Sequence, residues 1–186
     1  MCGFVGFLAA NSPLGMAENK TIVNAMADRL EHRGPDDQGI WCDLNSEIML
    51  GFRRLSILDL SEAGHQPMIS RSGRYIVAFN GEIYNHLDLK KDLEESGQIE
   101  WKSYSDTEVL VEAIDRYGFP RALKNFNGMF AIAAWDLKRK ELFLGRDRFG
   151  EKPLYYGKQK GTFLFGSELK ALVKHPDWKG VEDHTA

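Results

Sequence analysis

The chain has 186 residues, a length that suits one domain with a substantial core. Its formal charge of -3, from 24 basic and 27 acidic residues, gives no basic excess that would favour nucleic acid or an anionic membrane as a partner. Two cysteines are too few for a disulfide scaffold, and no Cys-x-x-Cys or His-Glu-x-x-His spacing occurs, so we expect a cytoplasmic protein without a metal site.

The chain begins with Cys2 directly behind Met1, and an apolar run over residues 4–10 follows. That run is too short to span a membrane and indicates a buried strand. Removal of Met1 would put a thiol and a free α-amino group on Cys2. The residue could then be nucleophile and general base together, because an α-amine with a pKa of about 7.7–8.0 accepts a thiol proton near neutral pH. The alternative is a cysteine that is simply buried at the start of a strand.

Apolar spacing in the first half predicts a helix over residues 17–31, which Gly34-Pro35 ends, and paired strands over 39–41 and 47–53. A further strand over residues 74–80 should end at Asn80-Gly81, a common turn pair.

Helices are expected over residues 86–96 and 106–117, and Ser105 should cap the second of them. A strand meander should follow over residues 129–136, 141–146, 154–159 and 162–165. Ser167 should then cap a short helix that ends near residue 174, with a tail beyond it. Many antiparallel strands with a few helices indicate a layered α+β fold.

Several motifs occur in a fixed order along the chain. They are Cys2-Gly3, His32-Arg33-Gly34-Pro35-Asp36-Asp37, Arg54-Leu55-Ser56-Ile57-Leu58-Asp59, Phe79-Asn80-Gly81-Glu82-Ile83-Tyr84-Asn85, Ser105-Asp106-Thr107-Glu108 and Arg146-Asp147-Arg148-Phe149-Gly150-Glu151-Lys152-Pro153. This set resembles the glutamine amidotransferase domain of the asparagine synthetase family, over nearly the whole chain. The resemblance implies a four-layer αββα sandwich of two antiparallel sheets, the fold of N-terminal-nucleophile hydrolases.

The same resemblance implies the roles of the reacting groups. Cys2 would attack the side-chain amide of glutamine, release ammonia and leave a glutamyl thioester for water to cleave. The Asn80 amide and the Gly81 backbone N–H would form the oxyanion hole. His32 would order a loop, because the α-amine already supplies the base. Arg146, Asp147 and Arg148 would form an ion-pair network beneath the site.

Two charged residues would hold the free amino acid. Arg54 would bind the α-carboxylate through its guanidinium fork, and Asp106 would accept from the α-ammonium. Without the resemblance, a surface ion pair and a helix first-turn carboxylate are the better interpretations of these two residues. The remaining residues of the glutamine pocket would be Leu55, Ile57, Leu58 and Glu82. The neighbouring Arg53 should point to the opposite face of the strand.

Residues 1–174 would form the glutaminase domain, and residues 175–186 a tail or the start of a linker. The resemblance implies that a synthetase domain, which binds ATP and magnesium, uses the ammonia to amidate aspartate. Ammonia could instead serve a parent protein that amidates a sugar or peptide precursor. A third reading is a catalytically silent regulatory module, against which the complete set of site residues argues. The expected partners are glutamine and the linked synthetase domain, with a homodimer as a further assembly to consider.

Overall fold

The computed structural model describes residues 1–9, 14–43, 45, 48–56, 62–95, 97 and 99–180. Within these residues the strands form two antiparallel sheets. Sheet A has the order β2 (Asp37–Cys42), β3 (Ile48–Arg54), β1 (Gly3–Leu8), β9 (Thr162–Gly166) and β8 (Tyr155–Gln159). Sheet B has the order β4 (Met68–Ile69), β5 (Tyr75–Ile83), β6 (Gly128–Asp136) and β7 (Glu141–Arg146).

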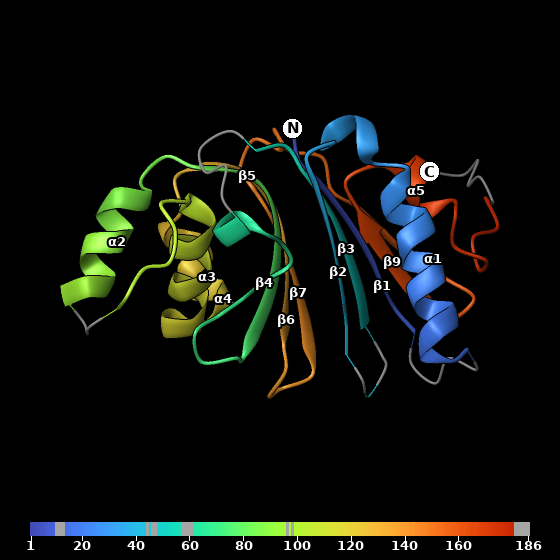
Figure 1. Cartoon of the computed structure of the whole chain (residues 1–186), viewed down its shortest axis with the longest axis horizontal. Coiled ribbons are helices and arrows are strands. Elements are labelled where there is room, and N and C mark those ends of the chain that lie inside the picture. The colour runs from blue at the N-terminus through green and yellow to red at the C-terminus, as the bar shows by residue number, and fades with distance from the viewer. Residues whose placement is uncertain are drawn as a thin grey trace.

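The sheets face each other, and helices cover both outer faces (Figure 1). The outer face of sheet A carries α1 (Met16–Asp28) and α5 (Leu169–Leu172). The outer face of sheet B carries α3 (Asp106–Tyr117) and α4 (Phe119–Asn125), and α2 (His86–Glu95) packs against α3 (Figure 1). Short 3₁₀ turns occupy Glu31–Arg33 and Glu62–Gly64. The expected αββα sandwich is therefore confirmed.

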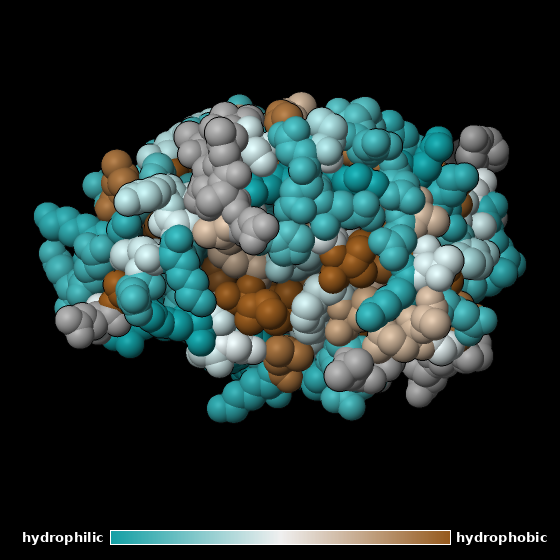
Figure 2. Space-filling model, viewed as in Figure 1, coloured by the Kyte–Doolittle hydropathy of each residue, from teal (hydrophilic) through white to brown (hydrophobic). Residues whose placement is uncertain are grey.

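Three apolar clusters hold the layers together, one in each gap between neighbouring layers. The central cluster lies between the sheets and includes Phe4, Phe52, Trp135 and Phe165, each at most 1% exposed. Hydrophobic side chains also appear near the centre of the surface in Figure 2, between the two halves of the molecule, within a mainly hydrophilic exterior.

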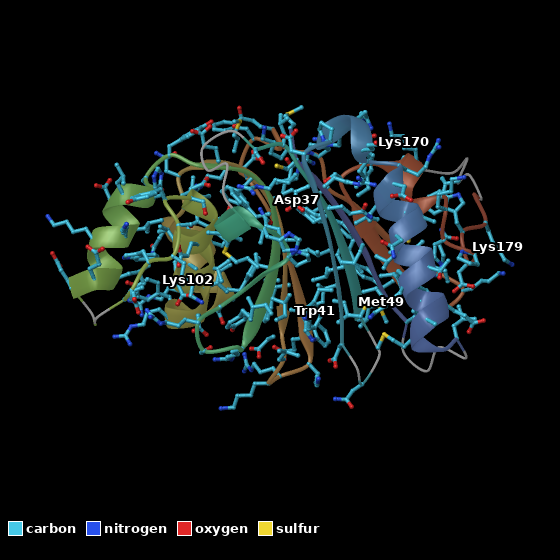
Figure 3. The ribbon with its side chains drawn as sticks, in the orientation of Figure 1. Asp37, Trp41, Met49, Lys102, Lys170 and Lys179 are labelled. Carbon is cyan, nitrogen blue, oxygen red and sulfur yellow. The ribbon has the colours of Figure 1, made fainter. Side chains whose placement is uncertain are left out.

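Strand alternation divides the side chains of sheet A between its two faces. Trp41 on β2 packs with the cluster between the sheets, whereas Met49 on β3 packs toward α1, and both are labelled in Figure 3. The same alternation sends Arg53 to Asp28 on α1 and leaves Arg54 for the other face. The expectation that these neighbouring arginines point in opposite directions is confirmed.

Two local expectations were wrong. Strand β5 does not end at Asn80-Gly81, because both residues continue the ladder with β6, opposite Ala131 and Phe130. Ser167 does not cap α5; its hydroxyl accepts from the Phe4 N–H at 3.1 Å and so ties the segment to β1.

No element was expected from the sequence in the stretch after Gly118. The chain turns there at a φ of 76° and forms α4, with proline in the first helical turn. By contrast, the Ser105 cap on α3 is confirmed, because its hydroxyl accepts from the Glu108 N–H.

No described helix is long and apolar enough to cross a membrane. Beyond residue 174 the described chain still packs on the domain: His175 is 5% exposed and contacts the Phe7 ring, and Trp178 lies against the cluster under α1. The division of the chain at residue 174 stays a prediction.

Candidate active site

Cys2 lies immediately before β1, at the edge of a pocket of about 190 Å³. Its thiol contacts the Leu55 backbone twice: the Leu55 N–H donates to Sγ at 3.4 Å, and Sγ donates to the Leu55 carbonyl at 3.6 Å. Burial raises the pKa of the Cys2 thiol, while the Leu55 backbone and the positive charges of the N-terminus and Arg54 oppose that rise. A base is therefore needed to form the thiolate near neutral pH.

The 3₁₀ turn after α1 links the start of β1 to the end of β3. Arg33 Nε donates to the Cys2 carbonyl at 2.9 Å. A Cβ on Gly34 would lie 2.5 Å from the backbone of Arg53 and Arg54, so only glycine fits against that peptide. The Asp36 N–H donates to the Arg54 carbonyl at 3.0 Å, which fixes the end of β3 beside Cys2.

Sheet B contributes the opposite wall of the pocket. Asn80 is 1% exposed, and its Nδ2 is buried without a hydrogen-bond partner among the residues that the structure describes. Gly81 follows it on β5, where a Cβ would lie 2.1 Å from the Met129 carbonyl oxygen. A buried donor without a partner is expensive, so its persistence beside Cys2 indicates a ligand atom that accepts from it.

Two buried charges of opposite sign line the same pocket. Arg54 is 7% exposed at the end of β3, and its guanidinium fills the space that a Cβ on Gly64 would occupy. Asp106 is 6% exposed in the first turn of α3, and its Oδ2 accepts from the Ile83 N–H at 2.8 Å. Burial raises the pKa of Asp106, although the Ile83 N–H and His86 oppose the rise. A cation at this carboxylate would relieve the cost of ionising it.

The structure thus brings together most of the residues expected from the sequence. The pocket is lined by Cys2, Arg54, Leu55, Asn80, Gly81, Glu82 and Asp106. Ile57 and Leu58 lie outside the described residues. Cys42 is half-buried on β2, packs with the cluster under α1 and does not line this pocket.

Sequence reasoning missed several residues of the pocket wall, among them Gln66 and Lys152. Lys152 is 6% exposed, and its ammonium lies 3.3 Å from the sulfur of Met1. Gln66 precedes a cis peptide bond to Pro67 and accepts from the Phe79 N–H at 2.7 Å. Lys152 stands in one of the ordered motifs, whereas Gln66 does not. The side chains of both residues reach the pocket through long-range contacts that no local sequence pattern contains.

The segment from Arg146 to Arg148 differs from its expected role. Asp147 accepts from backbone N–H groups, including those of Phe130 and Lys152, rather than from an arginine. Arg146 and Arg148 donate to backbone carbonyls, Arg146 to that of Lys152 at 2.6 Å. In the residues described by the structure, these contacts shape a loop beside the pocket and do not form an ion-pair network.

Comparisons with known proteins identify the family of the chain. A family model described as "Glutamine amidotransferase domain" matches residues 1–186. The chain is 40% identical to asparagine synthetase [glutamine-hydrolyzing] 3 of Bacillus subtilis over 187 residues, which cover 100% of this chain and 29% of that protein. It is 40% identical to a putative asparagine synthetase [glutamine-hydrolyzing] 2 of Methanocaldococcus jannaschii, covering 93% of this chain and 35% of that protein. It is also 32% identical to the amidase chry2 of Gibberella zeae, with coverages of 96% and 28%. The chain therefore spans about a third or less of each relative.

Solved structures support the fold. The glutamine phosphoribosylpyrophosphate amidotransferase of Bacillus subtilis superimposes with a TM-score of 0.75 at 23% identity, over 92% of this chain and 43% of that one. A structure described as the allosteric regulatory enzyme of purine biosynthesis gives the same TM-score at 24% identity, over 93% and 43% of the two chains. At these identities the likeness concerns the fold alone.

Proposed function

The chain belongs to the glutamine amidotransferase domain family, and on that premise we propose that its pocket hydrolyses glutamine to glutamate and ammonia with Cys2 as the nucleophile. The observation that carries the proposal is the meeting of four groups in one pocket: the Cys2 thiol, the Asn80 amide, and the charges of Arg54 and Asp106. The Nδ2 atom of Asn80 has no hydrogen-bond partner among the residues that the structure describes. A nucleophile, an oxyanion donor and a grip on both charges of an amino acid are what amide hydrolysis of free glutamine requires.

The chemical steps follow from these positions. After Met1 is removed, the Cys2 α-amine takes the thiol proton and Sγ attacks the side-chain carboxamide carbon. The oxyanion of the tetrahedral intermediate accepts from Asn80 Nδ2 and the Gly81 N–H. The protonated amine returns its proton to the leaving nitrogen, and ammonia departs from a glutamyl thioester. Water, deprotonated by the same amine, then cleaves the thioester to glutamate and restores the thiol.

Substrate recognition uses the two buried charges. Arg54 offers two parallel N–H donors, which match the α-carboxylate of glutamine. Asp106 pairs with the α-ammonium, and Glu82 and Leu55 line the rest of the pocket. Each charged side chain is almost fully buried, so an ion pair that it forms with the substrate is shielded from water.

The decisive experiment joins intact-mass measurement with a glutaminase assay. We expect activity only in preparations that lack Met1, because a peptide bond at the Cys2 nitrogen removes the base. Ammonia and glutamate should appear in equal amounts. Full activity from protein that retains Met1 would refute the amine as base, and no activity from correctly processed protein would refute the function.

We also propose that the parent protein is an asparagine synthetase, since two relatives at 40% identity carry that name. In such a protein a second domain, with bound ATP and magnesium, would use the ammonia to amidate aspartate. The Gibberella zeae amidase supports an alternative parent with another acceptor. Asparagine formation from aspartate, ATP and glutamine by the full-length protein would decide between them.

A further inference from the structure

Glu168, just before α5, is outside the pocket but is linked to its nucleophile. Glu168 Oε1 accepts from Arg33 Nη1 at 2.8 Å, and Arg33 Nε donates to the Cys2 carbonyl at 2.9 Å. One guanidinium therefore joins the carboxylate to the backbone of the nucleophile. Both side chains are largely shielded, with 9% of Arg33 and 22% of Glu168 exposed.

The Arg33 side chain has little freedom in this position. It crosses Gly3, where an added Cβ would lie 3.0 Å from Arg33 Cδ. On the other side of the strand, Ser167 makes two hydrogen bonds to Phe4. Its hydroxyl accepts from the Phe4 N–H at 3.1 Å, and its N–H donates to the Phe4 carbonyl at 2.8 Å. The residues on both sides of Cys2–Phe4 thus fix the strand that carries the thiol, and Glu168 belongs to that frame.

The carboxylate also has contacts on its solvent side. Lys170 Nζ lies 3.0 Å from Glu168 Oε2, and His32 Nε2 lies 3.1 Å from Oε1. Lys170, labelled at α5 in Figure 3, is 45% exposed, and His32 is 51% exposed. These exposed partners add little energy individually, whereas the shielded Arg33 contact determines where the guanidinium lies.

We propose that Glu168 is a positioning residue for the nucleophile: by orienting Arg33, it holds the Cys2 carbonyl, and through it the thiol, in the geometry for attack on glutamine. The inference rests on the proposed glutaminase function. Without the carboxylate, Arg33 can rotate away and the Cys2 carbonyl loses its donor. The thiol would then move relative to the Leu55 N–H and to the oxyanion donors on sheet B, while Arg54 and Asp106 stay in place.

The test is steady-state glutaminase kinetics on processed Glu168→Ala and Glu168→Gln. We expect Glu168→Ala to lower kcat by about 100-fold, the effect of a small misplacement of a reacting group. The kcat of Glu168→Gln should be about tenfold higher than that of Glu168→Ala, because the glutamine amide oxygen can still accept from Arg33. The KM for glutamine should change by less than about twofold in both variants, since the groups that bind its charges are untouched. The rate at which a glutamine-like electrophile labels Cys2 should fall in parallel with kcat.

Lys170→Met is the matched control, because it removes a partner of the same carboxylate on the solvent side. It should keep kcat within about twofold of the parent. Thermal melts give an assay temperature at which each variant is folded. If Glu168→Ala does not fold, the test is made on Glu168→Gln, which preserves the side-chain volume. Parental kcat in a folded Glu168 variant would overturn the proposal. So would a loss that appears mainly in KM. An inactive parent would instead refute the glutaminase function itself.

Discussion

The two walls of the pocket are built by different means. On the sheet A wall, the Cys2 backbone is held by a charged side chain, Arg33, which is itself held by Glu168. On the sheet B wall, Asn80 and Gly81 lie within the β5–β6 ladder, opposite Ala131 and Phe130. The nucleophile is thus positioned by side-chain electrostatics, and the oxyanion donors by backbone packing.

This difference determines which kinds of change disturb the geometry of each wall. Arrangements that depend on ion pairs respond to charge removal and to pH. An arrangement that depends on close backbone contact responds to added volume, as the 2.1 Å approach of a Cβ on Gly81 to the Met129 carbonyl shows. Variants on the two walls should therefore have distinct signatures.

The largest effect should come from the thiol itself. Cys2→Ala should abolish glutaminase activity, a loss of at least about 10⁴-fold, because no other group in the pocket can form the thioester. Cys42→Ala should leave the rate near the parental value, since Cys42 packs under α1 and is outside the pocket. Peptide mapping after treatment with a glutamine-like electrophile should locate the label on Cys2. A label on Cys42 would contradict the assignment.

Asn80→Ala tests the sheet B wall. It should lower kcat by about 10²–10³-fold, the usual effect of losing one oxyanion donor. Stability should suffer little, because Nδ2 has no partner to lose within the described part of the chain. Kinetics and a thermal melt on the same preparation check both statements. A parental kcat would show that the oxyanion is stabilised elsewhere.

Arg54→Lys and Asp106→Asn change the two residues that are proposed to bind the charges of glutamine, one on each wall of the pocket. Each should lower kcat/KM by about 10–100-fold, because the lysine loses the planar fork and the asparagine loses the charge. Both variants should lower kcat/KM to a similar extent, although different contacts hold the two residues in place. Parental kinetics in both would mean that these residues are structural.

Asp106→Asn should at the same time stabilise the fold near neutral pH. The pKa of Asp106 is raised above 3.8, so its protonated form is the one that the folded state favours. The stability that the uncharged Asp106 carboxyl contributes is fully present below its pKa in the unfolded chain. It is lost as the pH rises through the pKa of Asp106 in the folded protein. Thermal melts between about pH 3.5 and pH 7 should show the Asp106→Asn variant gaining stability over the parent as the pH rises. A difference that stays constant across this range would contradict the linkage.

The smallest expected change is the one in stability that the charge of Glu168 provides. Burial opposes its ionisation, but hydrogen bonds from Arg33, Lys170 and His32 outweigh burial and lower its pKa from 4.5 to about 2. The resulting stability is present above pH 4.5 and is lost as the pH falls toward 2. After allowance for solvent screening, Glu168→Gln should lower the free energy of unfolding by about 1 kcal/mol at pH 7. Denaturant titrations should show that difference shrinking below pH 4.5, and a difference that persists at pH 2 would contradict the charge-based account.

The ordered motifs, through the family resemblance, were sufficient for the four layers of the fold and for most of the residues that line the pocket. Amphipathic spacing located α1, α2 and α3, and alternation separated Arg53 from Arg54. Sequence patterns failed where tertiary contacts override a local signal. Asn80-Gly81 has the composition of a turn, yet pairing with β6 keeps both residues in a strand.

Other misses have the same origin. Ser167 has the composition of a helix cap, yet its hydroxyl is committed to Phe4, 163 residues away in sequence. Arg33 and Glu168, separated by 135 residues, carry no local sign of being partners. Contacts of such range arise only when β1 and β9 become neighbours, so no pattern confined to a short window can contain them.

The place of β1 between β3 and β9 has a consequence for the timing of biosynthesis. Strand β1 leaves the ribosome well before its neighbour β9, whose final residue is Gly166. At about 5–20 residues per second, that interval is roughly 10–30 s. Throughout it, the Arg33–Glu168 contact cannot form and the N-terminus is still accessible to an aminopeptidase. Trimming of the nascent chain can thus precede assembly of the pocket, so that the thiol meets its oxyanion donors only after its amine is free.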